Sequence, residues 1–517
     1  MLNYRDLVSD MRFDTHGEFV QKVMGTLKLD DQQVEMLLNP IEQVCESEAV
    51  YNIVDFLKRS KHLIICGDYD VDGVTSTAIG MMLAKQMGIK RVGYYIPNRF
   101  DEGYGVSIKT IQSAYEKGYT DVLLVDNGVK SHQEIELALS LGMNVAVVDH
   151  HVLKLPFFDV PLLHPDLLDS YYKGMSAGGL MYLVSEAFGF TPHKVKAFAA
   201  LSTIADVMPV WGKNREIILK GLEAINQEPL LHFDLISKQK AYDARTLAFN
   251  VIPKINSVGR MADLVNMNTM VQFLLSDDEK TIRQYALQIH ATNDLRKKKG
   301  HAARSLAMRQ LGTGPVDVII DDQIHEGILG IVANQVLNVT QKPAIVLRRN
   351  GDVYKGSARS DAMSLSTLFE RLNREYFEAY GGHDFAYGMS IKHDKIDEFV
   401  EDVMKVAANL PNEKRDFPII YLDFPINETM ISQLLNFEPY GEGFQLPLFA
   451  IDKPDNARIY SMNGYGYKYV FQNYWLKDAV YFNAHADRVS LENAKVLIGS
   501  FQFHPKFGLS FQVDMLK

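Results

Sequence analysis

Three carboxylates at alternate positions, directly after an apolar run, constrain this 517-residue chain more than any other feature. The run at residues 63–66 is followed by Gly67 and then by Asp68, Asp70 and Asp72. The run has the pattern of a short buried strand and residues 74–87 have helical spacing, so the acids are expected at a strand-to-helix junction. Alternate side chains of an extended segment point the same way. Because like charges at that distance repel, a divalent cation such as Mg²⁺ or Mn²⁺ is the expected partner.

The acidic stretch has two other interpretations. It resembles the opening of a calcium-binding EF-hand loop, and it could be a solvated acidic turn. An EF-hand loop needs a Glu at its twelfth position, where this chain has Ile79. The calcium loop is therefore disfavoured, whereas the residues alone leave the solvated turn open.

Length and composition indicate an ordinary globular protein of about two to four domains. Hydrophobic residues make up 47% and charged residues 23% of the chain. No early apolar stretch resembles a signal peptide and none is long enough to span a bilayer, which predicts a cytoplasmic protein. Two cysteines, Cys45 and Cys66, are too few for a disulfide framework. The net charge of −10 excludes a general attraction for nucleic acid, so such binding would need a local basic channel.

Short apolar runs alternate with helical stretches after residue 61, which predicts a parallel sheet with crossover helices. Ligands of such sheets gather beyond the carboxyl ends of the strands. Polar residues follow three of the four predicted strands, so we expect them at one edge of the sheet. The strands are 63–66, 92–96, 122–125 and 145–148, the helices include 107–117 and 133–141, and the residues at the edge are Asp68, Asp126, Asp149, His150 and His151.

Carboxylates and imidazoles at one edge provide the ligands of a dinuclear metal site. Carboxylates can bridge two cations, and neutral nitrogen ligands favour Mn²⁺ over Mg²⁺ or Ca²⁺. Two cations about 3.5–4 Å apart activate a water and stabilise the leaving oxygen of a phosphate ester. The sequence therefore predicts metal-assisted hydrolysis of a phosphate ester.

Four segments together resemble the successive motifs of the DHH phosphoesterase superfamily, and further segments resemble, in order, those of its branch of single-strand-specific 5′→3′ DNA exonucleases. The resemblance covers roughly residues 60 to 450. It implies a metal-dependent exonuclease that hydrolyses phosphodiester bonds of single-stranded DNA in DNA repair and recombination. The superfamily motifs are 67–73, 126–128, 149–151 and 205–209, and the others are 98–105, 256–261, 356–360 and 381–383.

The resemblance also implies a ligand set for two divalent ions, Mn²⁺ or Mg²⁺. The implied ligands are Asp70, Asp72, Asp126, His150 and Asp206, with Asp68 and His151 in or next to that set. Judged without the resemblance, Asp206 could equally be an acid at a helix terminus. Asn127 departs from the Thr that the family often has, at a position expected just outside the ligand set.

Five more residues resemble those that hold the strand in this branch. Arg99, Ser357 and Arg359 match positions associated with the 5′-terminal phosphate, and Arg260 one near the scissile phosphate. His383 matches a histidine of the second domain that reaches the active site. On the residues alone, Arg99 could form a surface ion pair and His383 could be structural. The basic cluster at 296–299 is either a solvated face or a wall of the strand channel.

The pattern and the resemblance together divide the chain into five parts with an α/β fold class. The aromatic residues of the last part either form its core or stack on bases. The parts are an N-terminal helical segment (1–55), a DHH-type parallel-sheet catalytic domain (56–275), a long connector helix (276–311), a second α/β domain similar to the DHHA1 substrate-binding domain (312–410) and a C-terminal β-barrel similar to an OB-fold (411–517).

Two other functions fit parts of the sequence. A small-substrate DHH phosphodiesterase similar to the nanoRNases would use the same metals, although the connector helix and the last domain argue against it. A non-catalytic scaffold that only binds strands would not need the intact acids. For the exonuclease, the resemblance implies single-stranded DNA with a 5′ end, a single-strand-binding protein or helicase as further partners, no membrane, and a monomer. The preferred metal, RNA tolerance and processivity stay open.

Overall fold

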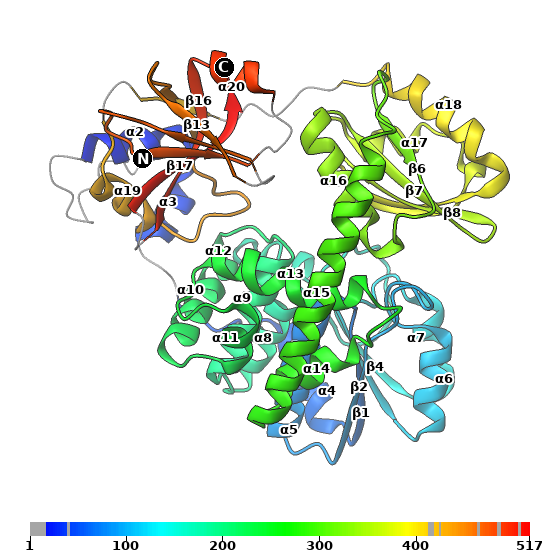
Figure 1. The fold of residues 1–517 in the computed structure, drawn as a ribbon. Helices are drawn as coiled ribbons and strands as arrows, with labels where there is room; N and C mark the ends of the chain where they lie inside the picture. Colours follow the sequence, from blue (N-terminus) through cyan, green and yellow to red (C-terminus); the bar gives the residue numbers. More distant parts are fainter. Residues whose placement is uncertain are drawn as a thin grey trace.

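The computed structural model describes residues 17–38, 42–411, 418–422, 425–462, 466–482, 487–504 and 508–517. The described residues contain three sheets with their own helices (Figure 1). Within the predicted domain boundaries, the three sheets belong to the first α/β domain (56–275), the second α/β domain (312–410) and the C-terminal β domain (411–517).

The sheet of the first α/β domain has five parallel strands in the order β2-β1-β3-β4-β5, which confirms the predicted parallel sheet. Strand β3 is buried along its whole length, as expected of a run of Val and Leu in the middle of a parallel sheet. All carboxyl ends lie at one edge because the strands are parallel. The strands are β1 (His62–Cys66), β2 (Arg91–Tyr95), β3 (Asp121–Val125), β4 (Asn144–Val148) and β5 (Leu162–Leu163).

Helix α5 (Val71–Gln86) follows β1 and is buried on nearly every face. Its small residues, among them Ala78 and Gly80, allow α8 and α9 to pack closely against it. The remaining helices of the domain surround this helix and the sheet: α4 (Glu48–Arg59), α6 (Ile108–Glu116), α7 (His132–Ser140), η1 (Pro165–Leu167), η2 (Ser170–Tyr172), α8 (Ala177–Ala187), α9 (His193–Ala205), α10 (Gly212–Gln227), α11 (Leu231–Ser237), α12 (Ala244–Thr246), η3 (Leu247–Val251), α13 (Ile252–Arg260) and α14 (Asn268–Leu275).

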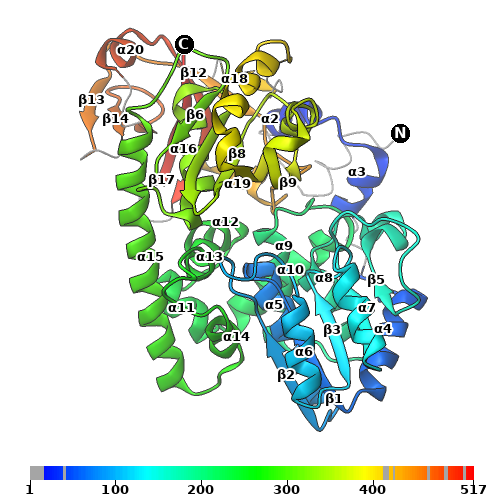
Figure 2. The same ribbon diagram turned by 90° about the vertical axis from the view of Figure 1, so that its right-hand side faces the viewer.

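The predicted connector is the helix α15 (Glu279–Ala307), which runs alongside both α/β domains (Figure 2). Asp278 caps its N-terminus by accepting a hydrogen bond from the Thr281 backbone N–H. Ile282 and Ile289 pack into the core of the first domain, whereas Ala303 and Ala307 pack into the second. Within the described residues no helix, this one included, has the length and the apolar character needed to cross a membrane.

The second α/β domain has a mixed sheet in the order β6-β7-β8-β10-β9, in which only β6 and β7 are parallel. Its α/β character was predicted from the sequence. The elements are β6 (Asp317–Ile320), η4 (Glu326–Ile328), α16 (Leu329–Thr340), β7 (Ala344–Asn350), β8 (Val353–Arg359), α17 (Leu365–Glu370), η5 (Arg374–Tyr376), β9 (Phe377–His383), β10 (Ala386–Lys392), η6 (His393–Lys395) and α18 (Ile396–Ala407).

The C-terminal β domain contains a seven-stranded, mainly antiparallel sheet in the order β11-β12-β16-β17-β15-β14-β13. The predicted β structure is confirmed, and its assignment to the OB-fold stays a prediction. The elements are β11 (Ile419–Tyr421), α19 (Glu428–Leu435), β12 (Leu448–Asp452), β13 (Arg458–Ser461), β14 (Tyr467–Val470), β15 (Asp478–Tyr481), α20 (Arg488–Asn493), β16 (Val496–His504) and β17 (Gly508–Leu516).

The predicted N-terminal helical segment does not pack as one unit. Helices α2 (Gly17–Thr26) and α3 (Asp31–Leu38) lie beside the C-terminal β domain (Figure 1) and share a core with it. In that core the Phe19 ring stacks on Phe449 at 6.1 Å between centroids. Helix α4 instead packs into the core of the first domain through Val50 and Ile53. The two ends of the described chain therefore lie in the same domain.

Candidate active site

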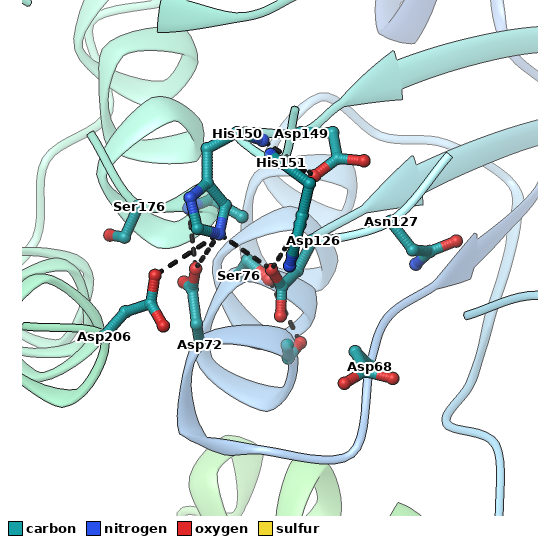
Figure 3. A network of polar contacts seen from close by, with 12 residues as sticks. Asp68, Asp72, Ser76, Asp126, Asn127, Asp149, His150, His151, Ser176 and Asp206 are labelled. Atoms are coloured by element: carbon teal, nitrogen blue, oxygen red, sulfur yellow. Dashed lines mark hydrogen bonds and ion pairs between the residues drawn. The ribbon is translucent and has the colours of Figure 1, made fainter. Parts of the chain in front are cut away.

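The predicted acids and histidines meet at the carboxyl edge of the first sheet (Figure 3). Asp68 and Asp70 follow β1, Asp126 follows β3, and the histidine pair follows β4, as expected. Asp72 lies in the first turn of α5, and Asp206 comes from the C-terminal end of α9. Three groups bring ligand atoms within 4.8 Å of one another: Asp72, His150 and Asp206; Asp68, Asp70 and Asp126; and Asp126, His150 and His151.

The imidazole of His150 lies at the centre of the cluster. Its Nε2 atom is 3.2 Å from Asp126 Oδ1, 3.4 Å from Asp206 Oδ2 and 3.5 Å from Asp72 Oδ2. Asp126 also belongs to the group formed with Asp68 and Asp70. A carboxylate shared by two groups is the arrangement in which one ligand bridges two cations.

Asp72 is held by the N-terminus of α8. Its two carboxylate oxygens accept hydrogen bonds from the backbone N–H groups of Ala177 and Gly178, both at 2.8 Å. The Ser202 hydroxyl donates a further hydrogen bond to the same carboxylate. These three hydrogen bonds fix the direction of the carboxylate, and backbone N–H groups at a helix N-terminus are suited to holding an anionic group.

The turn between β1 and α5 explains the spacing of the three acids. The Asp70 carboxylate caps α5 by accepting a hydrogen bond from the Gly73 N–H at 3.1 Å. A Cβ atom at Gly73 would overlap the backbone of Asp68, so only glycine permits this turn. The backbone of Asp126, at φ 59°, adopts the left-handed conformation that is uncommon for residues other than glycine and often marks functional sites.

Burial and mutual repulsion shift the ionisation of the cluster. Burial, followed by repulsion from neighbouring carboxylates, raises the pKa of Asp68, Asp70 and Asp126 and raises that of Asp206 to about 9. Burial also lowers the pKa of His150, which keeps the imidazole neutral and able to bind a metal. Carboxylates that cannot all be charged together, beside a neutral nitrogen, fit Mn²⁺ or Mg²⁺.

Asp149 orients the histidine pair. It accepts hydrogen bonds from the backbone N–H of His150 at 2.7 Å and of Val129 at 3.0 Å, and it lies 2.9 Å from His151 Nδ1. Burial alone would raise the pKa of Asp149, but these hydrogen bonds and the His151 charge lower it to about 2. Sequence reasoning expected Asp149 at this edge of the sheet but did not predict that it orients the histidines.

Two further polar residues support the cluster. The Tyr104 hydroxyl donates to the Asp126 carbonyl oxygen at 2.7 Å and lies 3.0 Å from His151 Nδ1. Asn127 donates to the carbonyl oxygens of Cys66 and Val125, at 3.0 and 2.8 Å, and belongs to none of the three ligand groups among the described residues. Sequence reasoning missed Tyr104, although its glycine-rich loop was singled out, and Ser202.

Four arginines gather beside the carboxylates: Arg99 from the loop after β2, Arg260 from the end of α13, Arg296 from α15 and Arg359 from the end of β8. Burial and the charges of the other three lower the pKa of Arg260 to about 9. Among the described residues, none of the four forms an ion pair with a carboxylate side chain. Such unneutralised guanidinium groups suit a polyanionic ligand.

Ser357 and Arg359 face the beginning of α16. Arg359 Nη1 donates to Ser357 Oγ at 3.0 Å. A Cβ atom at Gly330, in the first turn of α16, would lie 2.7 Å from Arg359 Nη2 and 3.1 Å from Ser357 Oγ. A helix N-terminus, a guanidinium and a hydroxyl thus converge, as in many phosphate sites.

The structure does not bring His383 into the metal cluster. This residue lies exposed at the end of β9 and belongs to none of the three ligand groups among the described residues. Its predicted role therefore stays a prediction.

Comparisons with known proteins agree with this architecture. Residues 62–208 match the DHH family, N-terminal domain, and residues 304–409 match the DHHA1 domain. The chain is 28% identical to the single-stranded-DNA-specific exonuclease RecJ of Haemophilus influenzae, over 83% of this chain and 81% of that protein. It is 29% identical to the RecJ of Escherichia coli, over 78% of this chain and 77% of that protein.

Solved structures show the same fold. The crystal structure of RecJ from Thermus thermophilus in complex with Mn²⁺ superposes with a TM-score of 0.80 at 24% identity, over 96% of this chain and 77% of that chain. A structure of exonuclease RecJ bound to manganese has a TM-score of 0.62 at 27% identity and covers 72% of this chain and 97% of that chain.

The parallel sheet with its acidic edge, followed by a DHHA1 domain, defines a member of the DHH phosphoesterase superfamily. Within that superfamily the chain belongs to the RecJ family, in agreement with the resemblance of its motifs.

Proposed function

We propose that this protein is a metal-dependent exonuclease that hydrolyses the phosphodiester bonds of single-stranded DNA from the 5′ end. The observation that carries the proposal is the convergence of three carboxylates on His150 Nε2, beside four arginines that, among the described residues, form no ion pair with a carboxylate side chain. The relatives named as single-stranded-DNA-specific exonucleases support the substrate. The protein would act as a monomer in the cytoplasm, in DNA repair and recombination, with a single-strand-binding protein or a helicase as partner.

Two divalent ions, Mn²⁺ or Mg²⁺, fit the two halves of the cluster. Asp72, His150 and Asp206 would hold one ion, Asp68 and Asp70 the other, and Asp126 would contribute to both. The T. thermophilus RecJ structures, determined in complex with Mn²⁺ and with Mg²⁺, support this choice. When bound, such ions lower the pKa of a water molecule and stabilise the leaving oxygen of a phosphodiester. His151 would stay fixed beside the reacting groups by its contact with Asp149.

The arginines and Ser357 would hold the strand. In this proposal, Ser357, Arg359 and Arg99 bind the 5′-terminal phosphate, and Arg260 binds the backbone near the scissile phosphate. The position of Ser357 and Arg359 against the start of α16 supports the first assignment. The second assignment is supported by the nearness of Arg260 to both Arg99 and Asp70, whose charges act on its guanidinium. A captured end at a fixed distance from the metals would give the enzyme its direction. His383 would contact the strand from the second domain.

End-labelled oligonucleotides test the proposal. The wild-type protein with Mn²⁺ or Mg²⁺ should release the 5′ label first and shorten a 3′-labelled strand progressively, whereas a duplex should resist. Asp126→Ala should abolish both the release of the 5′ label and the shortening of the 3′-labelled strand, because Asp126 belongs to two of the ligand groups. Asp277→Ala is the matched control, because its exposed carboxylate pairs with Lys194 outside these groups. Release of the 3′ label first would refute the polarity, and a preference for dinucleotides over long strands would favour a small-substrate phosphodiesterase.

A further inference from the structure

The metal-ligand candidate Asp206 is joined by a short segment to the contact between the first α/β domain and the C-terminal β domain. Helix α9 ends at Ala205, the segment 206–211 follows, and α10 begins at Gly212. Ile204, two residues before Asp206, packs against the cores of both domains. Whatever fixes this segment therefore also fixes the position of the Asp206 carboxylate.

Asp206 differs from Asp72 in how its carboxylate is held. Asp72 accepts three hydrogen bonds from α8 and Ser202. Among the described residues, the only side-chain partner recorded for Asp206 is His150 Nε2, and the Asp206 side chain is 31% exposed. The next residue, Val207, adopts φ 53°, which is rare for a β-branched residue. The backbone N–H groups of Asp206 and Met208 donate to the carbonyl oxygens of Ser202 and Thr203 in α9, so the helix fixes where the segment 206–211 begins. The other end of the segment is fixed outside α9.

A loop of the C-terminal β domain, residues 437–444, supplies that support. The backbone N–H of Val210 donates to the Glu442 carbonyl oxygen at 3.0 Å, and Trp211 Nε1 donates to the Gly443 carbonyl oxygen at 2.9 Å. The Trp211 ring lies 4.7 Å from that of Phe444, between centroids. The two residues that the first α/β domain contributes to this contact, Val210 and Trp211, lie within five residues of Asp206.

Arg215 fastens the same loop one turn further along α10. Its guanidinium donates to the carbonyl oxygens of Phe437 at 2.8 Å, Glu438 at 3.0 Å and Pro439 at 3.2 Å. The residue is buried, so these three carbonyl oxygens replace its water shell. The contact combines a charge-assisted hydrogen-bond network with aromatic packing, which makes it stiff.

We propose that the loop 437–444 positions Asp206 for metal binding, so that the C-terminal β domain controls how tightly the metal centre assembles. Val210, Trp211 and Arg215 are positioning residues that act through the backbone of segment 206–211. This inference rests on the proposed metal centre and adds a role for the C-terminal β domain, to which the proposed function assigns none. A β domain displaced from this contact shifts the segment 206–211, turns the Asp206 carboxylate and weakens the site that Asp206 shares with Asp72 and His150.

Binding of Mn²⁺ to the whole protein, measured from the electron paramagnetic resonance signal of the free ion, tests the inference without using activity. Arg215→Ala and Trp211→Phe should each weaken Mn²⁺ binding roughly tenfold, the usual effect of removing a group that orients a ligand. Trp211→Phe keeps a smaller aromatic ring and removes the Nε1–H donor, so it is the deciding variant if Arg215→Ala does not fold. Arg488→Ala is the control, because Arg488 pairs with Glu492 within α20 of the C-terminal β domain, outside the loop 437–444, and should leave binding unchanged.

Combination with Asp206→Asn separates positioning from general destabilisation. If the loop acts through Asp206, Trp211→Phe should weaken Mn²⁺ binding in the wild-type background and add nothing in the Asp206→Asn background. In activity assays the half-saturating Mn²⁺ concentration should rise while the KM for the strand at saturating Mn²⁺ stays constant.

Three results would overturn the inference: wild-type Mn²⁺ affinity in folded Trp211→Phe, an additive effect in the double variant, or a rise in strand KM without a shift in Mn²⁺ requirement. The failure of the proposed function would look different. If Asp206→Asn itself bound Mn²⁺ as tightly as the wild type, the metal centre would be wrongly assigned, and the positioning role would fall with it.

Discussion

Gly327 of the second α/β domain lies directly against the backbone of Arg260 in the first, where a Cβ atom would overlap the Arg260 carbonyl group. Arg260 Nη1 also reaches the Gly327 carbonyl oxygen at 3.5 Å. The two domains thus meet, backbone to backbone, at the residue proposed to hold the strand near the scissile phosphate.

Gly327→Ala should therefore separate the two domains at this point and reduce kcat/KM by up to about 100-fold, since a displacement of 1 Å can cost that much. Steady-state kinetics on a single-stranded oligonucleotide measure the effect. The matched control is Gly300→Ala in α15, where a Cβ atom has no neighbour within 4 Å. That change should keep activity and stabilise the helix by about 0.5–1 kcal/mol. Equal activity of both variants would show that the contact is not needed.

Metal binding should release protons at neutral pH. The pKa of Asp206 is raised from 3.8 to about 9, so its carboxyl group is mostly protonated at pH 7 in the metal-free protein. Mn²⁺ affinity should therefore increase with pH up to about 9 and then level off. Calorimetry in buffers of different ionisation enthalpy counts the protons, and Asp206→Asn should release fewer. A pH-independent affinity between 6 and 9 would contradict this expectation.

The same shift predicts how the stability of the metal-free protein depends on pH. The folded form retains a proton on Asp206 that the unfolded form loses above its ordinary pKa, so the free energy of unfolding should fall as the pH rises from about 4 to about 9. Thermal unfolding with a chelator should show a smaller fall over this window in Asp206→Asn. An equal pH dependence in both proteins would argue against the shift.

Arg296 should contribute more to strand binding than the lysines that follow it. Its charge acts on Arg260, whereas Lys297 and Lys298 are exposed. Arg296→Ala should weaken strand binding and reduce the slope of log affinity against log salt by about 0.7, the value for one lost phosphate contact on a single strand. Lys298→Ala should change neither. Equal effects of the two substitutions would indicate that the whole 296–299 cluster lines the strand channel.

The 5′ phosphate should be recognised through Arg359. Arg359→Ala should reduce the preference for a 5′-phosphorylated strand over a 5′-hydroxyl strand by about 10- to 100-fold, because a charge-assisted hydrogen bond contributes about 1.5–3 kcal/mol. Arg359→Lys should restore only part of it, because an ammonium group cannot bind a phosphate bidentately. The exposed Arg349, on the neighbouring strand, is the control. An unchanged preference in Arg359→Ala would remove this residue from the 5′ site.

The edge of the first sheet could be predicted because its residues follow the strands directly. Asp68, Asp126 and His150 each come within two residues of a strand end, so the parallel order alone places them together. Asp206 follows a helix, and only the packing of α9 against α5 brings it to the site. Asp206 was assigned to the site from the motif resemblance, because a residue pattern does not show which helix ends lie close to the sheet edge.

The groups that orient the ligands could not be predicted from the sequence for a similar reason. Asp72 is fixed by backbone N–H groups of α8, and backbone groups leave no signal in residue type. The amphipathic pattern of α2 and α3 predicts that these helices pack against a core, but it does not identify which domain provides that core. Their partners, such as Ile431 and Phe449, come some 400 residues later.

That shared core has a consequence for the order in which the molecule can be made. During synthesis, α2 and α3 leave the ribosome before both α/β domains, yet Phe19 and Val23 find their apolar partners only after α19 and β12 have been translated. Contacts so distant in sequence form slowly. The core of the C-terminal β domain is therefore completed only after both α/β domains have been translated, and a nascent chain must keep two amphipathic helices unpaired until then.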